Sequence, residues 1–253
     1  MPRQARVKSI TGIYHIMLRG IDKRDIFLDN EDKLKFLESI EKAKEKGKFN
    51  VLGFCLMDNH VHMLLKEYEE IGTSIKRITV GYVGWHNKKH DRTGHLFQNR
   101  YMSEPVNTEE YLVTVLRYIH QNPVKARIVT SVKDYKWSSY GFYYLFYNGQ
   151  KTIIDGTLIE NYFGTFEEFS RYMNTVNDDE CLEAKTVKHN TDNKLTKIIT
   201  DKYKVINLPE LPFDKKKAII KDIYIMENTS IRQLSRVFGM GKSIVEKVLK
   251  KDE

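Results

Sequence analysis

The sequence contains few cysteines and no long apolar run, and each scarcity excludes a class of protein. Its 253 residues include two cysteines, Cys55 and Cys181, of which Cys55 lies within an apolar run. They provide no disulfide framework and no four-cysteine zinc site, and a reducing, cytoplasmic location is expected. No segment approaches the roughly 20 apolar residues of a membrane helix, and no apolar stretch of signal-peptide length follows MPRQARVK. We therefore expect a soluble intracellular protein with no membrane partner.

Positive charge is in excess and unevenly distributed. The formal net charge is +8, and the isoelectric point is about 9.2. Lysine and arginine outnumber aspartate and glutamate by 24 to 17 in residues 1–150 and by 12 to 8 in residues 201–253, but are outnumbered by 9 to 6 in residues 151–200. Basic surfaces bind polyanions such as nucleic acids by releasing counterions, although a basic chain can also simply be soluble.

The order of the expected elements predicts an α+β fold. In chain order we expect a strand at 12–18, a helix from Asp29 or Asn30 to near Gly47, strands at 51–57 and 60–66, a helix at 71–89, a strand near 101–106, and a helix that begins at Asn107 or Thr108 and stops before Pro123. The turn formers Asp58 and Asn59 predict a tight hairpin between the middle strands. This order is that of a ferredoxin-like (RRM-like) palm with an antiparallel sheet, and we expect its helices on one face.

Three segments are expected along the chain. Residues 1–173 form the main domain, in which the aromatic residues 137–172 pack onto the palm. Residues 174–212 form a linker and connecting segment, because 174–193 are polar and acidic with few apolar residues. Residues 213–253 form a small helical domain.

The C-terminal domain has the pattern of a helix-turn-helix. Apolar periodic segments at 231–238 and 243–249 are separated by Gly239-Met240-Gly241, and a further helix is expected at 215–226. Lys242 and Lys247 lie in or beside the last helix and are candidates for contact with DNA. A small helical bundle that binds proteins is the alternative.

The spacing of His60 and His62 places two imidazoles side by side. Side chains alternate along a strand, so residues two apart leave the same face. Their neighbours Val61, Met63 and Leu64 are apolar, and buried imidazoles in such surroundings need polar partners, which a metal ion would supply. Taken alone, a His-x-His pair is more often incidental than a metal site.

A tyrosine and an asparagine occupy one face of the helix that precedes Pro123. Tyr118 and Asn122 are four residues apart and therefore neighbours on a helix surface. The amide oxygen of Asn122 could complete a metal site with the two histidines, with Tyr118 beside it. The chain has 15 tyrosines, however, and a tyrosine on an apolar helix face usually belongs to the core.

Several runs together resemble one protein family. MDNHVHMLL, GHLFQNRYMS, YLVTVLRYIHQNPVKA and WSSY are similar to segments of the REP-associated tyrosine transposases, relatives of the single-tyrosine transposases of small insertion sequences. The resemblance covers roughly residues 5–150. It implies a HUH-type nuclease in which His60, His62 and Asn122 hold the metal and Tyr118 is the nucleophile. It further implies Mg²⁺ or Mn²⁺ as the working ion, single-stranded DNA with a hairpin or palindromic repeat as substrate, and a monomer or homodimer.

The same resemblance identifies secondary candidates. The segment YHIMLRG recurs in the family, and its polar residues are candidates for the floor of the site or for strand binding, with a structural role as an alternative. The basic turn GHLFQNR could contact phosphates or bases, and many relatives have arginine after the valine of NPVK. The candidates for DNA contact are therefore His15, Arg19, His95, Gln98, Arg100 and Lys125.

These residues predict a metal-dependent single-strand DNA endonuclease and strand transferase. Attack by Tyr118 on a phosphate would leave a phosphotyrosine bond to one DNA end and a hydroxyl on the other, so a second hydroxyl could rejoin strands without ATP. Two alternatives remain open. In one, water attacks and Tyr118 only packs; in the other, the protein is a domesticated DNA-binding regulator that uses residues 213–253 and has little or no nuclease activity.

Overall fold

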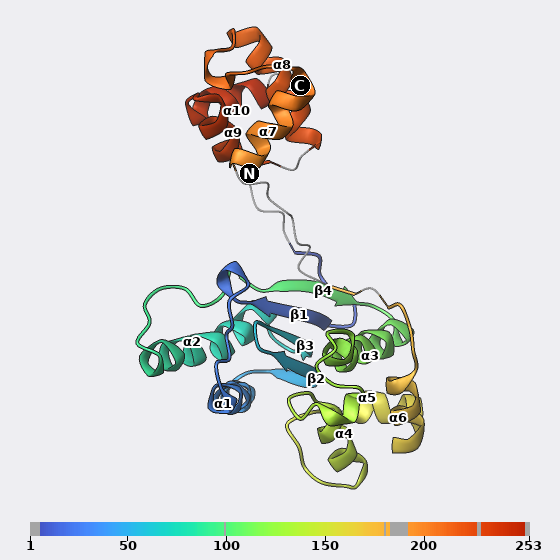
Figure 1. The fold of residues 1–253 in the computed structure, drawn as a ribbon. Helices are drawn as coiled ribbons and strands as arrows, with labels where there is room; N and C mark the ends of the chain where they lie inside the picture. Colours follow the sequence, from blue (N-terminus) through green and yellow to red (C-terminus); the bar gives the residue numbers. More distant parts are fainter. Residues whose placement is uncertain (1–5, 99, 180, 183–191, 227–228, 251–253) are drawn as a thin grey trace. The chain divides into compact units, whose positions relative to one another are not determined.

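The chain folds into two compact units. The structure is a computed structural model that describes residues 6–98, 100–179, 181–182, 192–226 and 229–250. The first unit is Met1–Ala184 and the second is Lys185–Glu253 (Figure 1). Each unit has its own apolar core.

The first unit contains a four-stranded antiparallel sheet in the order β2-β3-β1-β4. Its palm consists of β1 (Ile13–Arg19), the short 3₁₀ helix η1 (Ile21–Lys23), α1 (Asn30–Lys46), β2 (Phe49–Met57), β3 (His60–Glu67), α2 (Ile71–Lys89) and β4 (Met102–Val106), followed by α3 (Glu109–Lys125). Asp29 caps α1 by accepting a hydrogen bond from the Asp32 amide, and two residues connect β2 to β3. The predicted α+β fold with an antiparallel sheet is confirmed.

The register of the sheet separates its two faces. His60 and His62 on β3 lie opposite Arg19 and Met17 on β1, and paired residues of an antiparallel sheet share a face. Leu18 projects to the other face, where it lines a groove together with residues of α2. The histidines therefore face away from the layer of α1 and α2.

Helix α3 covers the histidine face. Gly53 of β2 pairs with Leu64, which lies on the same face as His62, and a Cβ atom at Gly53 would overlap with the Leu116 Cδ1 atom of α3. A larger residue at position 53 would therefore require the Leu116 side chain to shift. Helices thus lie on both sides of the sheet, α1 and α2 on one and α3 to α6 on the other (Figure 1), and the prediction of helices on one face was wrong. The strand-helix pattern of the palm includes α1 and α2 alone, whereas α3 follows β4 and covers the remaining apolar face.

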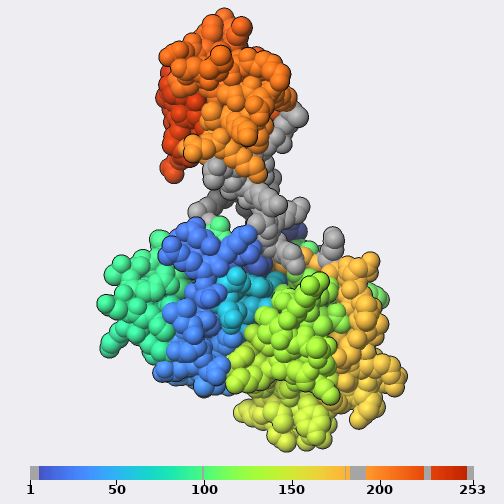
Figure 2. Space-filling model, in the orientation of Figure 1, coloured from blue at the N-terminus to red at the C-terminus, as the bar shows by residue number. Residues whose placement is uncertain are grey.

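The layers leave little of the sheet exposed. In β2 every residue except Asn50 is buried, and in Figure 2 only a small part of the cyan segment, which includes β2 and β3, reaches the surface between the blue and green segments. Most side chains of the two central strands, β1 and β3, are therefore buried as well.

Helix α3 begins at the expected cap but continues past the expected end. The Thr108 side chain accepts a hydrogen bond from the Tyr111 amide. Pro123 lies inside the helix, which ends at Lys125, so the prediction of a stop before Pro123 was wrong. The last turn is closed by the Ala126 amide, which donates to the Asn122 carbonyl at 2.9 Å. This extension keeps Asn122 in a helical turn next to Tyr118.

Three aromatic helices pack behind α3. They are α4 (Tyr140–Tyr147), α5 (Thr157–Phe163) and α6 (Phe166–Asn174), preceded by the 3₁₀ helix η2 (Val132–Asp134). His120 of α3 is buried among Tyr140, Tyr143 and Phe169, and its Nε2 lies 2.7 Å from the Ser139 Oγ. His120 therefore belongs to the core.

The secondary structure of the second unit consists of helices alone in its described residues. It contains α7 (Asp192–Tyr203), the 3₁₀ helix η3 (Leu208–Glu210), α8 (Phe213–Met226), α9 (Ile231–Phe238) and α10 (Lys242–Lys250). Leu195, Ile199 and Leu208 are buried in its core, so the segment 174–212, expected to be a linker, supplies part of that core. Leu195 and Ile199 are four residues apart and therefore lie on one face of α7. Among the described residues, no helix has the length and apolar character needed to cross a membrane.

Candidate active site

Three histidines meet on the face of the sheet that α3 covers. The His60 and His62 ring centroids are 5.1 Å apart. His15 on β1 is completely buried, and its Nε2 lies 2.9 Å from the Nδ1 of His62, within hydrogen-bond distance. The strand period thus brings His60 and His62 to one face as predicted, and the antiparallel register adds His15 beneath them.

Both histidines of the pair have one ring nitrogen held by a neighbour. The Nδ1 of His62 is held by His15, and the Nδ1 of His60 lies 2.6 Å from the Asn59 Oδ1. In metal sites the second nitrogen of a ligating histidine is usually hydrogen-bonded in this way, which fixes the ring orientation. The Nε2 atoms are therefore the ones positioned to bind a metal, and the arrangement fits a metal site.

Burial keeps the deeper histidines neutral. Desolvation lowers the pKa of His62 well below its usual value, and the neighbouring His15, His60 and Arg19 lower it further. Desolvation also lowers the pKa of His15, against the opposing effect of Glu104, whose carboxylate lies 3.7 Å from the His15 Nδ1. Neutral imidazole is the form that binds metal ions.

Tyr118 stands over the histidines. Its ring centroid is 5.7 Å from that of His62 and 5.9 Å from that of His15, with edge-to-face geometry in both pairs. The Lys125 ammonium lies 5.2 Å from the centroid of the Tyr118 ring and donates a hydrogen bond to the Asp179 carbonyl at 2.9 Å. Tyr118 is only 2% exposed, so its side chain is almost entirely covered by its neighbours.

Asn122 lies one helical turn beyond the tyrosine. Its amide nitrogen donates to the Tyr118 carbonyl at 3.4 Å. This leaves the amide oxygen as the atom that would bind a metal, and Asn122 is half-buried. The helix therefore presents a phenol and an amide to the same histidine face.

The other predicted residues are distributed between this site and more distant surfaces. Arg19 is half-buried and pairs in register with His60, which places it at the edge of the site. His95, Gln98 and Arg100 are exposed in the connection after α2, and the Gln98 amide donates to the Arg19 carbonyl at 2.9 Å. This connection is thus attached to the end of β1, next to the histidines.

Lys242 and Lys247 are exposed on α10 of the second unit. Lys242 forms an ion pair with Glu246 at 3.4 Å. Gly239 ends α9 in the left-handed conformation, with a φ of 59°, and allows the tight turn into α10. The two helices and their turn have the expected order, and contact with DNA at these lysines stays a prediction.

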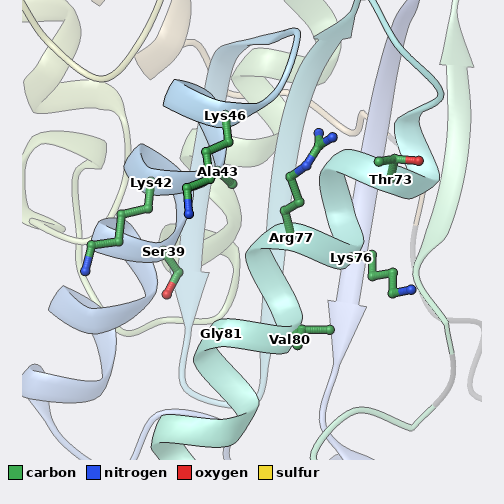
Figure 3. A pocket seen from close by; sticks show the side chains of 9 residues that line it. All are labelled: Ser39, Lys42, Ala43, Lys46, Thr73, Lys76, Arg77, Val80 and Gly81. Carbon is green, nitrogen blue, oxygen red and sulfur yellow. The ribbon is translucent and has the colours of Figure 1, made fainter.

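A separate basic groove runs between α1 and α2. Its volume is about 430 Å³, and Figure 3 shows Lys42 and Lys46 on α1 and Lys76 and Arg77 on α2 along it. Arg77 is paired with Glu69. None of the residues predicted for the active site lines this groove, which lies in the helix layer on the other side of the sheet.

A family comparison covers the segment that holds the histidines and the tyrosine. Residues 8–122 match the family described as "Transposase IS200 like". This segment is an IS200-like transposase domain. The transposase domain extends from before β1 to Asn122, so it includes His60, His62, Tyr118 and Asn122, and the family relationship predicted from the sequence is confirmed.

The transposase domain also has a structural relative. A solved structure described as "REP associates tyrosine transposase bound to a REP hairpin" is similar, with a TM-score of 0.51 and 17% sequence identity, over 73% of this chain and 96% of that chain. At this identity the similarity concerns the fold. No match was found among curated proteins.

Two polar partners in the transposase domain were not foreseen from the sequence. Asn59 was interpreted as a turn former only, although its position directly before His60 allowed contact with the imidazole. Glu104 contacts His15 through the pairing of β1 with β4. That pairing joins residues far apart in the chain, and no local pattern indicated it.

Proposed function

We propose that the protein is a metal-dependent DNA endonuclease and strand transferase that cleaves hairpin-containing single-stranded DNA through a phosphotyrosine intermediate. The observation that carries the proposal is the position of Tyr118 above His62, with ring centroids 5.7 Å apart. A phenol, two oriented imidazoles and an amide on one face form a set suited to phosphoryl transfer. Membership of the transposase family supports DNA as the substrate.

The metal would be held by the Nε2 atoms of His60 and His62 and by the amide oxygen of Asn122. The partners of the two Nδ1 atoms, His15 and Asn59, would keep the rings in place. When bound, a divalent ion such as Mg²⁺ or Mn²⁺ supplies electrostatic polarisation of the phosphate and stabilises negative charge on the oxygen that leaves.

Tyr118 would attack the phosphorus with its phenolic oxygen. A phosphorus–oxygen bond to tyrosine forms, and the bond between phosphorus and the departing sugar oxygen breaks. The phenol loses a proton and the departing oxygen gains one, so cleavage needs neither water nor a nucleoside triphosphate. The positive charge of Lys125, 5.2 Å from the ring centroid, would attract the phosphate to Tyr118. The reverse reaction with another sugar hydroxyl would join strands.

The test is an adduct assay with the full chain. Labelled single-stranded hairpin DNA from the flanks of the gene is incubated with Mg²⁺ or Mn²⁺ and run on a denaturing protein gel. We expect label linked to the protein, and we expect its loss on chelation and in the Tyr118→Phe and His60→Ala variants. Tyr147→Phe is a matched control, since it removes a phenol from α4, away from the histidines.

Two other results of this assay would each support one of the alternative functions. Cleavage without linked label would show that water attacks and would refute the role of Tyr118 as nucleophile. Binding of the hairpin and of unrelated DNA with neither cleavage nor linked label would refute the endonuclease and favour the DNA-binding regulator.

We also propose that the second unit binds duplex DNA through α9 and α10. Ser230 caps α9, Gly239 allows the turn, and Lys242 and Lys247 are exposed on α10, which is the order of a helix-turn-helix. The exposed lysines would contact phosphates. In this proposal the second unit selects the DNA site, and the transposase domain cleaves it.

A further inference from the structure

A cluster of two histidines and an aspartate joins the start of α1 to the end of α2. Asp32 lies in the first turn of α1, His86 in the last turn of α2, and His90 is the residue that ends α2. Among the described residues, this is the one group of three His, Cys, Asp or Glu side chains whose potential ligand atoms all lie within 4.8 Å of one another. The cluster belongs to the helix layer opposite the histidine face.

The geometry of α2 directs both imidazoles to one point. His86 and His90 are four residues apart and therefore neighbours on the helix surface, and their ring centroids are 4.5 Å apart. The His90 Nε2 lies 2.9 Å from the Asp32 Oδ1. Two imidazoles at this spacing and one carboxylate make up a ligand set that zinc commonly takes.

His86 has no hydrogen-bond partner in this cluster. Its side chain is completely buried, and neither its Nδ1 nor its Nε2 forms a hydrogen bond. A buried polar group without a partner is costly, and most such groups in proteins are satisfied. Burial lowers the pKa of His86 to about 4, so the ring is neutral at pH 7 and its one unprotonated nitrogen can bind a metal ion.

The surrounding charges favour a divalent cation. Asp32 is completely buried and accepts hydrogen bonds from the Leu28 amide at 2.7 Å and from the Lys89 ammonium at 2.9 Å. Lys89 also pairs with Asp29 at 2.8 Å and with Glu31 at 2.9 Å. Three carboxylates therefore surround the single ammonium of Lys89. If Asp32 bound a metal ion, Lys89 would still be paired with Asp29 and Glu31.

We propose that Asp32, His86 and His90 form a second metal site, suited to zinc, that fastens the start of α1 to the end of α2. Two imidazoles and one carboxylate are ligands that suit zinc and similar transition ions. The site would also anchor the connection that follows α2. This connection is held by the Asn87 side chain, which donates to the Gly94 carbonyl at 3.0 Å, and it reaches the end of β1 at Arg19. The role is structural and does not depend on the proposed endonuclease activity.

The test measures zinc binding by the full chain in a His60→Ala background, which weakens the other metal site. Competition with a chromophoric chelator should give one zinc per chain. Asp32→Asn and His90→Gln should each weaken this binding by about 100-fold, whereas His95→Gln, which changes an exposed histidine outside the cluster, should not alter it. Zinc at 100 times its dissociation constant should raise the unfolding temperature by about 5–10 °C.

Cobalt provides a readout that does not depend on stability. Co²⁺ bound in place of zinc should give visible absorption bands typical of a low-coordinate nitrogen and oxygen site, and the bands should disappear in His86→Gln protein. Circular dichroism verifies that each variant is folded. If His86→Gln unfolds, the cobalt experiment uses His90→Gln instead, because His90 lies at the partly exposed end of the helix. Zinc binding that is absent, or that is unchanged in the Asp32 and His90 variants, would overturn the site.

Discussion

At the scale of single residues, the candidate active site depends on side chains that orient other side chains. His15 and Asn59 each hold the Nδ1 of one histidine, and Glu104 in turn contacts His15. The pair His60 and His62 was predictable because the strand period alone puts both on one face. Their partners were not predictable, because the contacts depend on strand register and on a turn conformation.

Asn122→Ala should raise the Mn²⁺ concentration that gives half-maximal adduct formation by at least about tenfold, because one oxygen ligand is lost. Asn122→Asp should keep the response close to wild type, since a carboxylate oxygen takes the same place. The measurement is the initial rate of adduct formation against Mn²⁺ concentration. Gln121→Ala is the control, because Gln121 donates to the Met173 and Thr175 carbonyls behind α3. An unchanged Mn²⁺ response in Asn122→Ala would remove this residue from the proposed site.

His15→Phe should weaken Mn²⁺ binding by about 10- to 100-fold, the usual cost of losing a residue that orients a metal-ligating histidine. Titration of Mn²⁺ binding by the full chain measures the change without reference to DNA cleavage. Tyr14→Phe alters the neighbouring residue, which projects to the opposite face of β1, and should leave the affinity intact. Equal losses of Mn²⁺ affinity in both variants would mean that substitutions in β1 disturb the strand as a whole, and would contradict the specific role of His15.

At the scale of elements, capping and packing explain where the helices lie. The sequence predicted the cap of α1 at Asp29 or Asn30 and that of α3 at Asn107 or Thr108, because short polar side chains precede apolar periodic segments there; the caps are Asp29 and Thr108. It did not predict α3 on the second face, since the position of a helix after the last strand depends on which apolar surface is still uncovered. Nor did it predict that α3 would include Pro123, which the last helical turn tolerates here because other amides close that turn.

The caps of α3 and α9 offer a matched pair of substitutions. The Ser230 side chain accepts a hydrogen bond from the Gln233 amide, as Thr108 does from Tyr111. Each change to alanine should cost about 1 kcal/mol of unfolding free energy. Chemical denaturation followed separately in the two units should show that Ser230→Ala destabilises the second unit alone and Thr108→Ala the first alone. A shift of both transitions by either variant would show that the units unfold together.

At the scale of the whole molecule, the chain joins an IS200-like transposase domain to a helical unit with its own core. The basic segments in the sequence correspond to these two units, but the boundary between them was not evident. The polar, acidic composition of residues 174–193 predicted a linker that continues to residue 212, and yet Leu195 and Ile199 are both completely buried. The polar stretch before residue 193 concealed the helix α7 that begins at Asp192 and buries Leu195 and Ile199.

Separate expression of residues 1–184 and 185–253 should yield two folded fragments, because each has its own buried cluster. We expect the first fragment to form the DNA adduct and the second to bind duplex DNA with an affinity that falls as salt increases. Circular dichroism, the adduct assay and salt-dependent binding measure these properties. Adduct formation that needs both units in one chain would contradict this division of roles.

The contact between Gly53 and Leu116 has a consequence for the evolution of the family. Where β2 approaches α3, a Cβ atom on residue 53 would occupy the space of a Leu116 methyl group. Relatives that share this packing should therefore keep glycine at the first position or combine alanine there with a shorter side chain at the second. Such covariation in an alignment would show that relatives keep β2 and α3 in close contact, and with it the tyrosine helix over the histidines. It should be found even among relatives whose overall sequences have diverged widely.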